Sequence, residues 1–467
     1  MKSADPLLAA WDETLQAKAN APAIFSPAEA SPQTFRQIEE KARACESKIN
    51  AFNAGQVVAV QIGNHKDWPS IFLACLRRRL VVLPLERSIS EQERAAALGI
   101  CSVAAVIEAT APDGSDFNVL PLERAAAPSG WGQDVPSLLK LTSGTTAAPR
   151  AIKFRSEQLL ADCDNICETM GITDADLNLG VIPISHSYGF SNLLTPLIAR
   201  GVPMVLSRDR LPRAVLNDLA RTKAIVFPGM PVFYQAFCEV PDPPELPNLR
   251  LCISAGAPLM ATWAKKFIEK FKQPIHSFYG SSECGGICYD REGAECEDGF
   301  VGSAMKNVEL EFLDSSAEAS QVRVRSKAVG DGYFPDSDDA RLRRGVFVPD
   351  DLLARHRVGF KIVGRISDVI NVAGKKVNPA EVETQLLQYA GVREAIVFGR
   401  KSSLRNEEVA ACVVADPDVQ ESELLRFCRT RLSGWQVPKR IFLLEAMPVS
   451  ERGKTSRREL AARFAEE

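Results

Sequence analysis

Short apolar runs alternate with helical segments over the first 360 residues, and this alternation constrains the fold more than any other feature. The segments GQVVAVQIGN, DWPSIFLACLRRR and LVVLPL predict a strand, a helix and a strand in succession. After residue 155, apolar residues at helical spacing precede LNLGVIPI, and the runs GVPMVLS, AIVFPG and LRLCISAGA predict further strands. Strands that alternate with helices predict a layered α/β architecture with largely parallel sheets.

The pattern changes between residues 290 and 365, where VELEFLD, SQVRVRS and GFKIVGR alternate as antiparallel strands do. The last hundred residues predict a separate set of elements, with a helix (PAEVETQLLQYA), two strands, a second helix and a final strand. We therefore expect a large α/β domain over residues 1–363 and a small α+β domain over residues 364–467.

Composition excludes several classes of function. The chain has 56 Lys and Arg against 59 Asp and Glu in 467 residues, so no overall charge favours nucleic acid. Its longest apolar runs fall well short of the roughly 20 residues that cross a bilayer. The amino terminus lacks the basic start and apolar core of a signal peptide. These features predict a cytoplasmic protein with no nucleic-acid partner and no membrane span.

The stretch LTSGTTAAPRAIKF, residues 141–154, has the residue types of a phosphate-binding loop. It combines four hydroxyl residues, a glycine that lets backbone N–H groups approach an anion, and the basic Arg150. The spacing is not that of a Walker A loop, GxxxxGK[ST]. Taken alone, such a stretch is more often a polar turn than a nucleotide site.

Three further motifs accompany this loop. SFYGSSECGG (277–286) sets an aromatic residue and hydroxyls before the carboxylate of Glu283, which suits base stacking and Mg²⁺ ligation. VGRISDVINVAGKKVNPAEVE (363–383) combines an Arg, an Asp and two Lys, and MPVSERGKTSRREL places Lys454 in a glycine-flanked loop near the end. The alternatives are a strand end with a glycine turn, a solvated surface loop and an ordinary basic tail.

In this order and spacing, the four motifs resemble the adenylate-forming superfamily, which includes acyl-CoA synthetases, aryl-acid ligases, luciferases and adenylation domains. Two shorter matches, PISHSYG and ISAGAPL, support the resemblance, which covers nearly the whole chain. It implies two α/β sheets and a small β-barrel-like part in the large domain, followed by a small mobile α+β domain. The implied activity is that of an ATP- and Mg²⁺-dependent acid–thiol ligase.

The resemblance also implies roles for individual residues. Lys454 would lie between the substrate carboxylate and the α-phosphate, His186 would begin the acid pocket, and Glu283 would bind Mg²⁺. Asp351 and Arg365 would hold the ribose. The other expected nucleotide-binding residues are Thr142, Ser143, Gly144, Thr145, Thr146, Arg150, Ala255, Gly256, Ala257, Pro258, Ser277, Tyr279, Gly280, Ser281 and Ser282.

In members of this superfamily the small domain rotates between the two half-reactions. The resemblance implies a pivot within residues 364–368, withdrawal of Lys454, and entry of the 371–378 loop. Gly374, Lys375 and Lys376 would then lie near the acceptor thiol. The acceptor is expected to be coenzyme A, and a separate carrier protein is the alternative.

The substrate is expected to be a small carboxylic acid with an uncharged tail, either aryl or medium-chain acyl. Amino-acid-activating relatives place an Asp where Ser187 stands, and a buried ammonium without a counter-charge is costly. The residues expected to line the pocket are apolar, small or uncharged: His186, Ser187, Phe190, Phe227, Met230, Ala255, Gly280, Cys284 and Gly285.

Departures from the family pattern indicate a divergent branch. Family loops commonly read TSG[ST]TGxPKG, whereas Ala147 replaces a Gly and Arg150 replaces the Lys here. A non-catalytic nucleotide- or acyl-binding relative is therefore the alternative from a different class. Retention of Glu283, Arg365 and Lys454 favours the enzyme.

Overall fold

The computed structural model divides the chain into two compact units, each described here by itself. It describes residues 5–26, 31–110, 116–122, 131, 134–142, 150–207, 210–372, 375–402, 406–448 and 456–464. The first unit contains Met1–Glu311, Arg323–Pro349 and Arg357–Phe360, and the second contains Phe312–Val322, Asp350–His356 and Lys361–Glu467.

One sheet of the first unit follows the order β15-β14-β13-β12-β11-β9-β10-β1-β2. Neighbours from β13 to β1 are parallel, and β14, β15 and β2 are antiparallel additions. The strands are β1 (Pro22–Phe25), β2 (Gln33–Thr34), β9 (Asn178–Gly180), β10 (Met204–Leu206), β11 (Val226–Gly229), β12 (Leu251–Ser254), β13 (Ile275–Ser281), β14 (Gly285–Tyr289) and β15 (Phe300–Ala304).

A second sheet in this unit has the order β19-β8-β7-β4-β3-β5-β6. Its central strands β7, β4, β3 and β5 are parallel, and their near-continuous Val, Ile, Leu and Ala content fits strands that are covered on both faces. The strands are β3 (Val57–Gln61), β4 (Val81–Pro84), β5 (Val103–Ala109), β6 (Phe117–Pro121), β7 (Leu138–Leu141), β8 (Ala151–Phe154) and β19 (Gly332–Phe334).

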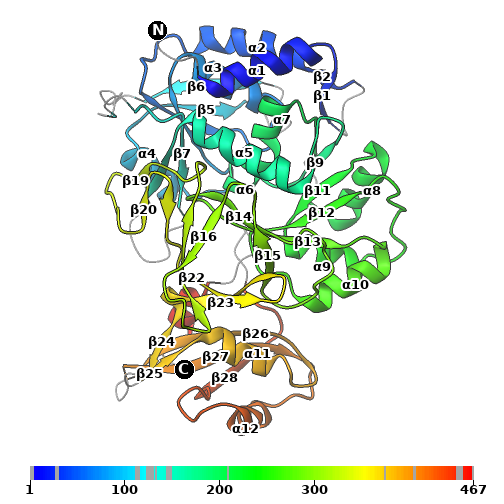
Figure 1. Ribbon diagram of the computed structural model, residues 1–467, viewed down its shortest axis with the longest axis vertical. Helices are drawn as coiled ribbons and strands as arrows, with labels where there is room; N and C mark the ends of the chain where they lie inside the picture. Colours follow the sequence, from blue (N-terminus) through cyan, green and yellow to red (C-terminus); the bar gives the residue numbers. More distant parts are fainter. Residues whose placement is uncertain are drawn as a thin grey trace. The chain divides into compact units, whose positions relative to one another are not determined.

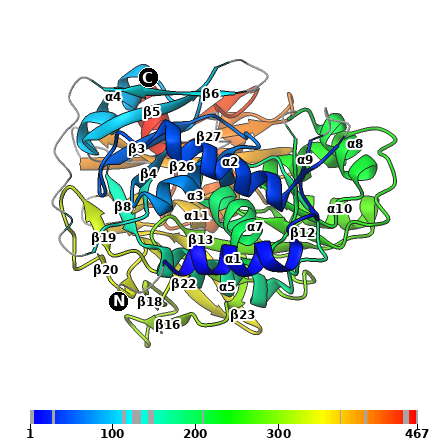
Figure 2. The same cartoon turned by 90° about the horizontal axis from the view of Figure 1, so that it is seen from above.

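Helix α5 (Ser156–Met170) is the central helix of the first unit (Figure 1). It packs against α1, α7, η1 and strand β14, and Figure 2 shows α1 and α7 side by side. The other helices are α1 (Pro6–Lys18), α2 (Phe35–Lys48), α3 (Trp68–Arg77), α4 (Glu91–Ile100), α6 (Ser187–Gly189), η1 (Phe190–Leu194), α7 (Thr195–Arg200), α8 (Pro212–Thr222), α9 (Pro231–Glu239) and α10 (Ala261–Phe271).

Local sequence signals explain where several of these helices begin and end. Thr34 and Gln37 form a capping box at the start of α2, and Ser90 and Glu93 form another at the start of α4. Gly171 ends α5 in the left-handed conformation, with φ of 63°. These caps satisfy backbone groups that a helix end leaves without partners.

Short antiparallel strands complete the first unit in the region where the sequence pattern changes. They pair in the order β16-β18-β21-β20, with bounds β16 (Glu309–Phe312), β18 (Val322–Arg325), β20 (Leu342–Arg343) and β21 (Val346–Phe347). Strand β21 is antiparallel to both β18 and β20, which confirms the antiparallel prediction for SQVRVRS.

The second unit has its own apolar core. Its main sheet follows the order β25-β24-β27-β26, with β28 beside β27, and the core contains Val377, Val382, Leu386, Val397 and Leu424. The elements are β17 (Ala319–Ser320), β22 (Asp351–His356), β23 (Gly359–Arg365), η2 (Ile366–Asp368), β24 (Ile370–Val372), β25 (Lys375–Val377), α11 (Pro379–Leu386), β26 (Val392–Ser402), β27 (Asn406–Ala415), α12 (Glu421–Arg431), β28 (Arg440–Leu444) and α13 (Arg457–Arg463). An α/β fold with several sheets and a small α+β unit is thus confirmed.

One predicted strand was too long. The run LNLGVIPI forms a strand only over β9, and residues 181–184 leave the sheet before α6. Pro183 has no N–H to donate to a neighbouring strand, which explains why the pairing does not continue through it.

Gly285 begins β14 in a conformation that needs glycine. Its φ is +68°, and a Cβ built there would lie 2.0 Å from Asp162 Oδ1 on α5. The Asp162 carboxylate accepts the N–H of Gly286 at 3.0 Å, so the turn and the helix are held at close range. Only a residue without a side chain fits this position.

We expect Gly285→Ala to lower the free energy of unfolding by about 2–4 kcal/mol, because it adds a steric clash to the backbone strain. Gly171→Ala is the matched control, since Gly171 has φ of +63° but no atom within 4 Å of the added Cβ. The control therefore measures only the cost of placing a side chain on a left-handed backbone, which is about 1 kcal/mol. Urea unfolding of both variants measures the difference, and equal losses would contradict the close contact with Asp162.

Candidate functional site

Several predicted site residues gather where parallel strands of the first sheet end. Met230 follows β11, Ala255 follows β12, Tyr279 lies near the end of β13, and His186 lies in the segment that follows β9. Parallel strands present their carboxyl ends at one edge of a sheet, and ligands of open α/β sheets bind at that edge. The fold thus brings together segments that are up to a hundred residues apart.

The segment Ala255 to Pro258 leaves the sheet in an open conformation. Ala255 N–H donates to Gly229 O at 3.2 Å, which ties this segment to the end of β11. Gly256 has φ of +87°, and its nearest neighbour would be Met230 Cγ, 3.8 Å from an added Cβ. A flat ligand could approach this exposed backbone closely.

Glu283 is held by donors from two sheets. Its Oε1 accepts Tyr333 Oη at 3.1 Å and its Oε2 accepts Ser281 Oγ at 2.7 Å. Its backbone oxygen accepts Gly330 N–H at 2.9 Å. Burial and the charge of Glu283 raise the pKa of Tyr333, so its phenol stays protonated and donates. A fixed carboxylate that retains acceptor capacity suits Mg²⁺, which is bound through one or two carboxylates plus phosphates.

His186 and Ser187 start the short helix α6. His186 Nδ1 accepts Tyr188 N–H at 3.2 Å, so the neutral ring carries its proton on Nε2. Ser187 Oγ donates to Ser282 Oγ at 3.0 Å. This hydrogen bond connects the predicted acid-binding segment to the turn that bears Glu283.

The hydroxyl-rich loop joins two antiparallel strands, β7 and β8, rather than a strand and a helix. Its first residue is anchored, since Thr142 donates to Arg150 O through both N–H (2.9 Å) and Oγ1 (3.2 Å). The Arg150 guanidinium lies 5.6 Å from the Tyr333 ring centre and 3.9 Å from Asp338. Ser143, Gly144, Thr145 and Thr146 lie outside the described residues.

Several of the predicted pocket residues are packed into the core. The Phe190 ring contacts Trp68 and Phe72, and the Phe227 ring contacts aromatic residues of α9. The Cys284 side chain is fully buried, and burial raises the pKa of its thiol, so it is not a nucleophile at neutral pH. Gly280 lies close to backbone, because an added Cβ would meet Gly285 O at 2.6 Å.

Lys140 on β7 is a charged residue near this site that the sequence reasoning missed. It is 5% exposed, and its Nζ lies 3.5 Å from Ser191 Oγ on η1 and 4.6 Å from the Phe154 ring centre. Burial lowers the pKa of its ammonium, and the nearby charges of Asp162 and Glu283 oppose that shift. A single Lys within the apolar run LLKL is the signal that could have revealed it.

Two predicted ribose-binding residues meet within the second unit. Arg365 Nε donates to Asp351 Oδ1 at 2.6 Å. Lys375 and Lys376 on β25 are exposed, and Lys375 Nζ lies 3.7 Å from the ring centre of Trp435. Gly374 and Lys454 lie outside the described residues.

Arg457 connects three parts of the second unit. Its guanidinium donates to Asp368 Oδ2 at 2.7 Å, to Glu383 Oε1 at 2.8 Å and to Val397 O at 3.0 Å. Arg457 is three residues after Lys454 in the sequence, and Asp368 ends the predicted pivot. The start of α13 is therefore tied to η2, α11 and β26.

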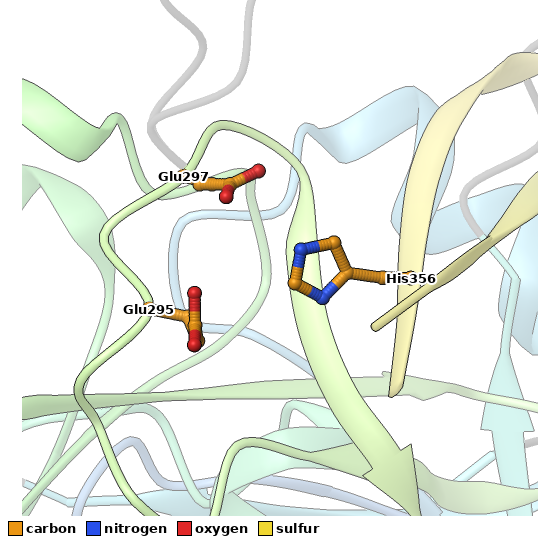
Figure 3. A group of neighbouring side chains, drawn as sticks. All are labelled: Glu295, Glu297 and His356. Atoms are coloured by element: carbon orange, nitrogen blue, oxygen red, sulfur yellow. The ribbon is translucent and has the colours of Figure 1, made fainter. Parts of the chain in front are cut away.

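Figure 3 shows the side chains of Glu295, Glu297 and His356. Glu295 and Glu297 extend from the loop between β14 and β15, and His356 ends β22. The carboxylates belong to the first unit and the imidazole to the second. Acidic groups at a surface are common without a bound ion, and no metal site is assigned to these residues.

Comparison with known proteins identifies the class of protein. Residues 11–334 match the family model described as "AMP-binding enzyme", and residues 381–454 match "AMP-binding enzyme C-terminal domain". The chain belongs to the AMP-binding enzyme family. The resemblance to adenylate-forming enzymes is thereby confirmed, and so is the prediction of an acid–thiol ligase. ATP and CoA are substrates of this class of ligase.

Individual relatives of this AMP-binding enzyme are distant. A probable CoA ligase of Humulus lupulus is 28% identical over 458 aligned positions, gaps included, and the match covers 88% of this chain and 87% of that protein. A feruloyl-CoA synthase of Amycolatopsis sp is 28% identical over 349 aligned positions, gaps included, and the match covers 71% of each chain. The crystal structure of ATP-bound MatB from Rhodopseudomonas palustris has a TM-score of 0.87 at 22% identity and covers 99% of each chain, so the fold is shared.

Within the described part of the AMP-binding enzyme, no helix is long and apolar enough to cross a membrane.

We expect Tyr333→Phe to raise the Mg²⁺ concentration for half-maximal activity about tenfold, because one of the two side-chain donors that orient Glu283 is lost. The Mg²⁺ dependence of ATP–pyrophosphate exchange measures this effect. Tyr389→Phe is the matched control, since Tyr389 Oη donates to Glu423 at 3.3 Å within the second unit. A Tyr333→Phe variant with an unchanged Mg²⁺ dependence would contradict the orienting role.

Proposed function

We propose that this enzyme activates a carboxylic acid with ATP as an acyl-adenylate and transfers the acyl group to coenzyme A. One observation carries the proposal. The Glu283 turn, the Ala255–Pro258 segment and the His186 segment all lie at the edge where the parallel strands of the first sheet end. The family match and the CoA ligases among the relatives support the same reaction.

In the first half-reaction, a carboxylate oxygen of the acid attacks the α-phosphorus of ATP, and pyrophosphate leaves. Two anions meet in this step, so positive charge and positioning supply most of the rate enhancement. We propose that Lys454 and Arg150 supply this positive charge. Tyr279 and the Ala255–Pro258 segment bind the adenine ring. Mg²⁺ would be bound by Glu283 and would neutralise phosphate charge.

In the second half-reaction, the thiol sulfur of coenzyme A attacks the acyl carbonyl carbon, and AMP leaves. We propose that the predicted small domain, residues 364–467, rotates between the steps and exchanges Lys454 for the segment that carries Lys375 and Lys376. The exposure of both lysines is compatible with an acidic or phosphorylated acceptor. A separate carrier protein is the alternative acceptor.

For the acid, we propose an aryl or medium-chain acyl body. Ser187 is hydrogen-bonded to Ser282 and supplies no carboxylate for a substrate ammonium, which disfavours amino acids. Met230 is partly exposed beside Gly256 and provides an apolar, adaptable surface.

ATP–pyrophosphate exchange over a panel of aryl and C4–C10 acids tests the proposal. We expect acid-dependent exchange with at least one member, and CoA-dependent release of AMP with the same acid. Amino acids serve as negative controls, with which we expect no exchange. Exchange with no acid would favour a non-catalytic binding protein, whereas exchange without CoA consumption would favour a carrier protein as the acceptor.

We expect Lys454→Ala to slow acyl-adenylate formation by at least a hundredfold while thioester formation from supplied acyl-AMP stays within about threefold. The charge is needed only when the two anions meet. Lys439→Ala, which removes an exposed lysine of the same unit, is the control. Equal loss in both half-reactions would contradict the assignment of Lys454 to adenylation alone.

A further inference from the structure

Lys140 is a buried cation with almost no polar partner. Within the described part of the chain, its Nζ forms no ion pair, and its one hydrogen bond, to Ser191 Oγ, is 3.5 Å long. The Phe154 ring covers another side of the ammonium. Three donors with one weak acceptor leave most of the desolvation cost of this group unbalanced.

The position of Lys140 in the fold does not require a charge. It lies on the strand β7 between Leu139 and Leu141, and Leu139 is fully buried. An unbranched apolar side chain such as Met would fill the same space without the desolvation cost. A retained cation at such a site indicates a role toward a ligand, because buried charges are normally paired.

The surroundings of Lys140 belong to the predicted acid-binding segments. Ser191 is on η1, which directly continues the α6 segment of His186 and Ser187. Glu283 and Cys284, in the turn after β13, lie near Lys140, and so does Asp162 of α5. The Lys140 side chain is therefore close both to the helix that continues from the His186 segment and to the turn that bears Glu283.

We infer that Lys140 selects acids that carry an oxygen acceptor at the end distal to the reactive carboxyl group. This inference rests on the proposed function. The distal oxygen, from a hydroxyl or a second carboxylate, accepts a hydrogen bond from Lys140 Nζ and supplies the partner that the protein lacks. A site built to hydrogen-bond a substrate oxygen rejects the analogue without it, because its own polar group then stays unpaired. Lys140 is thus a specificity residue, and the pocket ends in a polar group rather than an apolar one.

The test compares matched acids on wild-type enzyme and on Lys140→Met. Two series differ only at the distal end: hexanoate, 6-hydroxyhexanoate and adipate, and benzoate, 4-hydroxybenzoate and terephthalate. We expect the wild type to prefer a distal-oxygen acid over its parent by at least tenfold in kcat/KM for exchange. Lys140→Met reverses this preference while the parent acid keeps or gains activity. Which acid is favoured distinguishes a hydroxyl from a carboxylate.

Lys153→Met is the matched control, since Lys153 lies on the neighbouring strand β8, opposite Leu139, and is half-buried. It should leave the preference unchanged. A wild type that prefers the parent acids, or a Lys140→Met variant that loses all acids by the same factor, overturns the inference. Binding of the corresponding acyl-sulfamoyl adenosines, measured by calorimetry, gives the same comparison without turnover.

The two proposals fail in different ways. If the wild type shows ATP–pyrophosphate exchange only with the parent acids, the ligase function is supported and the role of Lys140 is contradicted. If neither the panel above nor these six acids supports exchange on any variant, while all variants keep the wild-type unfolding midpoint, the ligase function falls and the role of Lys140 with it.

Discussion

The position of the Glu283 carboxylate depends on contacts between the two large sheets of the first unit. Glu283 is in the turn between β13 and β14 of one sheet, whereas Tyr333 is on β19, the edge strand of the other. The Gly330 N–H donates a hydrogen bond to the backbone oxygen of Glu283. Removing either sheet from its place would free the carboxylate, so the geometry of this site is a property of tertiary packing rather than of the turn.

Helix α5 provides a second constraint on that turn. Asp162 accepts the Gly286 N–H, and the space it needs excludes a side chain at Gly285. Asp162 also acts on the charge of Lys140, which comes from the other sheet. The negative charges of Asp162 and Glu283 thus favour the charged form of Lys140, and burial disfavours it. A ligand oxygen that accepts a hydrogen bond from Lys140 Nζ would favour the charged form further.

The sequence alone predicted the parallel sheets because buried strands and amphipathic helices have different periods, and residues such as Val57 to Val60 leave little ambiguity. The roles of Ala255, Tyr279 and His186 were predicted from the family resemblance alone, and the structure has their segments at the carboxyl ends of neighbouring parallel strands. Tyr333 could not be predicted, because the pairing of β19 with β8 brings it to Glu283 from 50 residues away. Phe190 and Phe227 illustrate a further limit, since composition does not distinguish a pocket wall from a packed core.

The second unit holds the start of α13 through one arginine side chain. Arg457 ties the start of α13 to Asp368 of η2, to Glu383 of α11 and to the backbone of β26. Arg457 therefore fixes the start of α13 within this unit, three residues after Lys454 in the sequence. In the proposed two-step reaction, Lys454 reaches or leaves the substrate through the orientation of the whole unit. A local rearrangement would have to break three contacts of one guanidinium, two of them to carboxylates, and hydrogen bonds to charged groups are worth roughly 1.5–3 kcal/mol each.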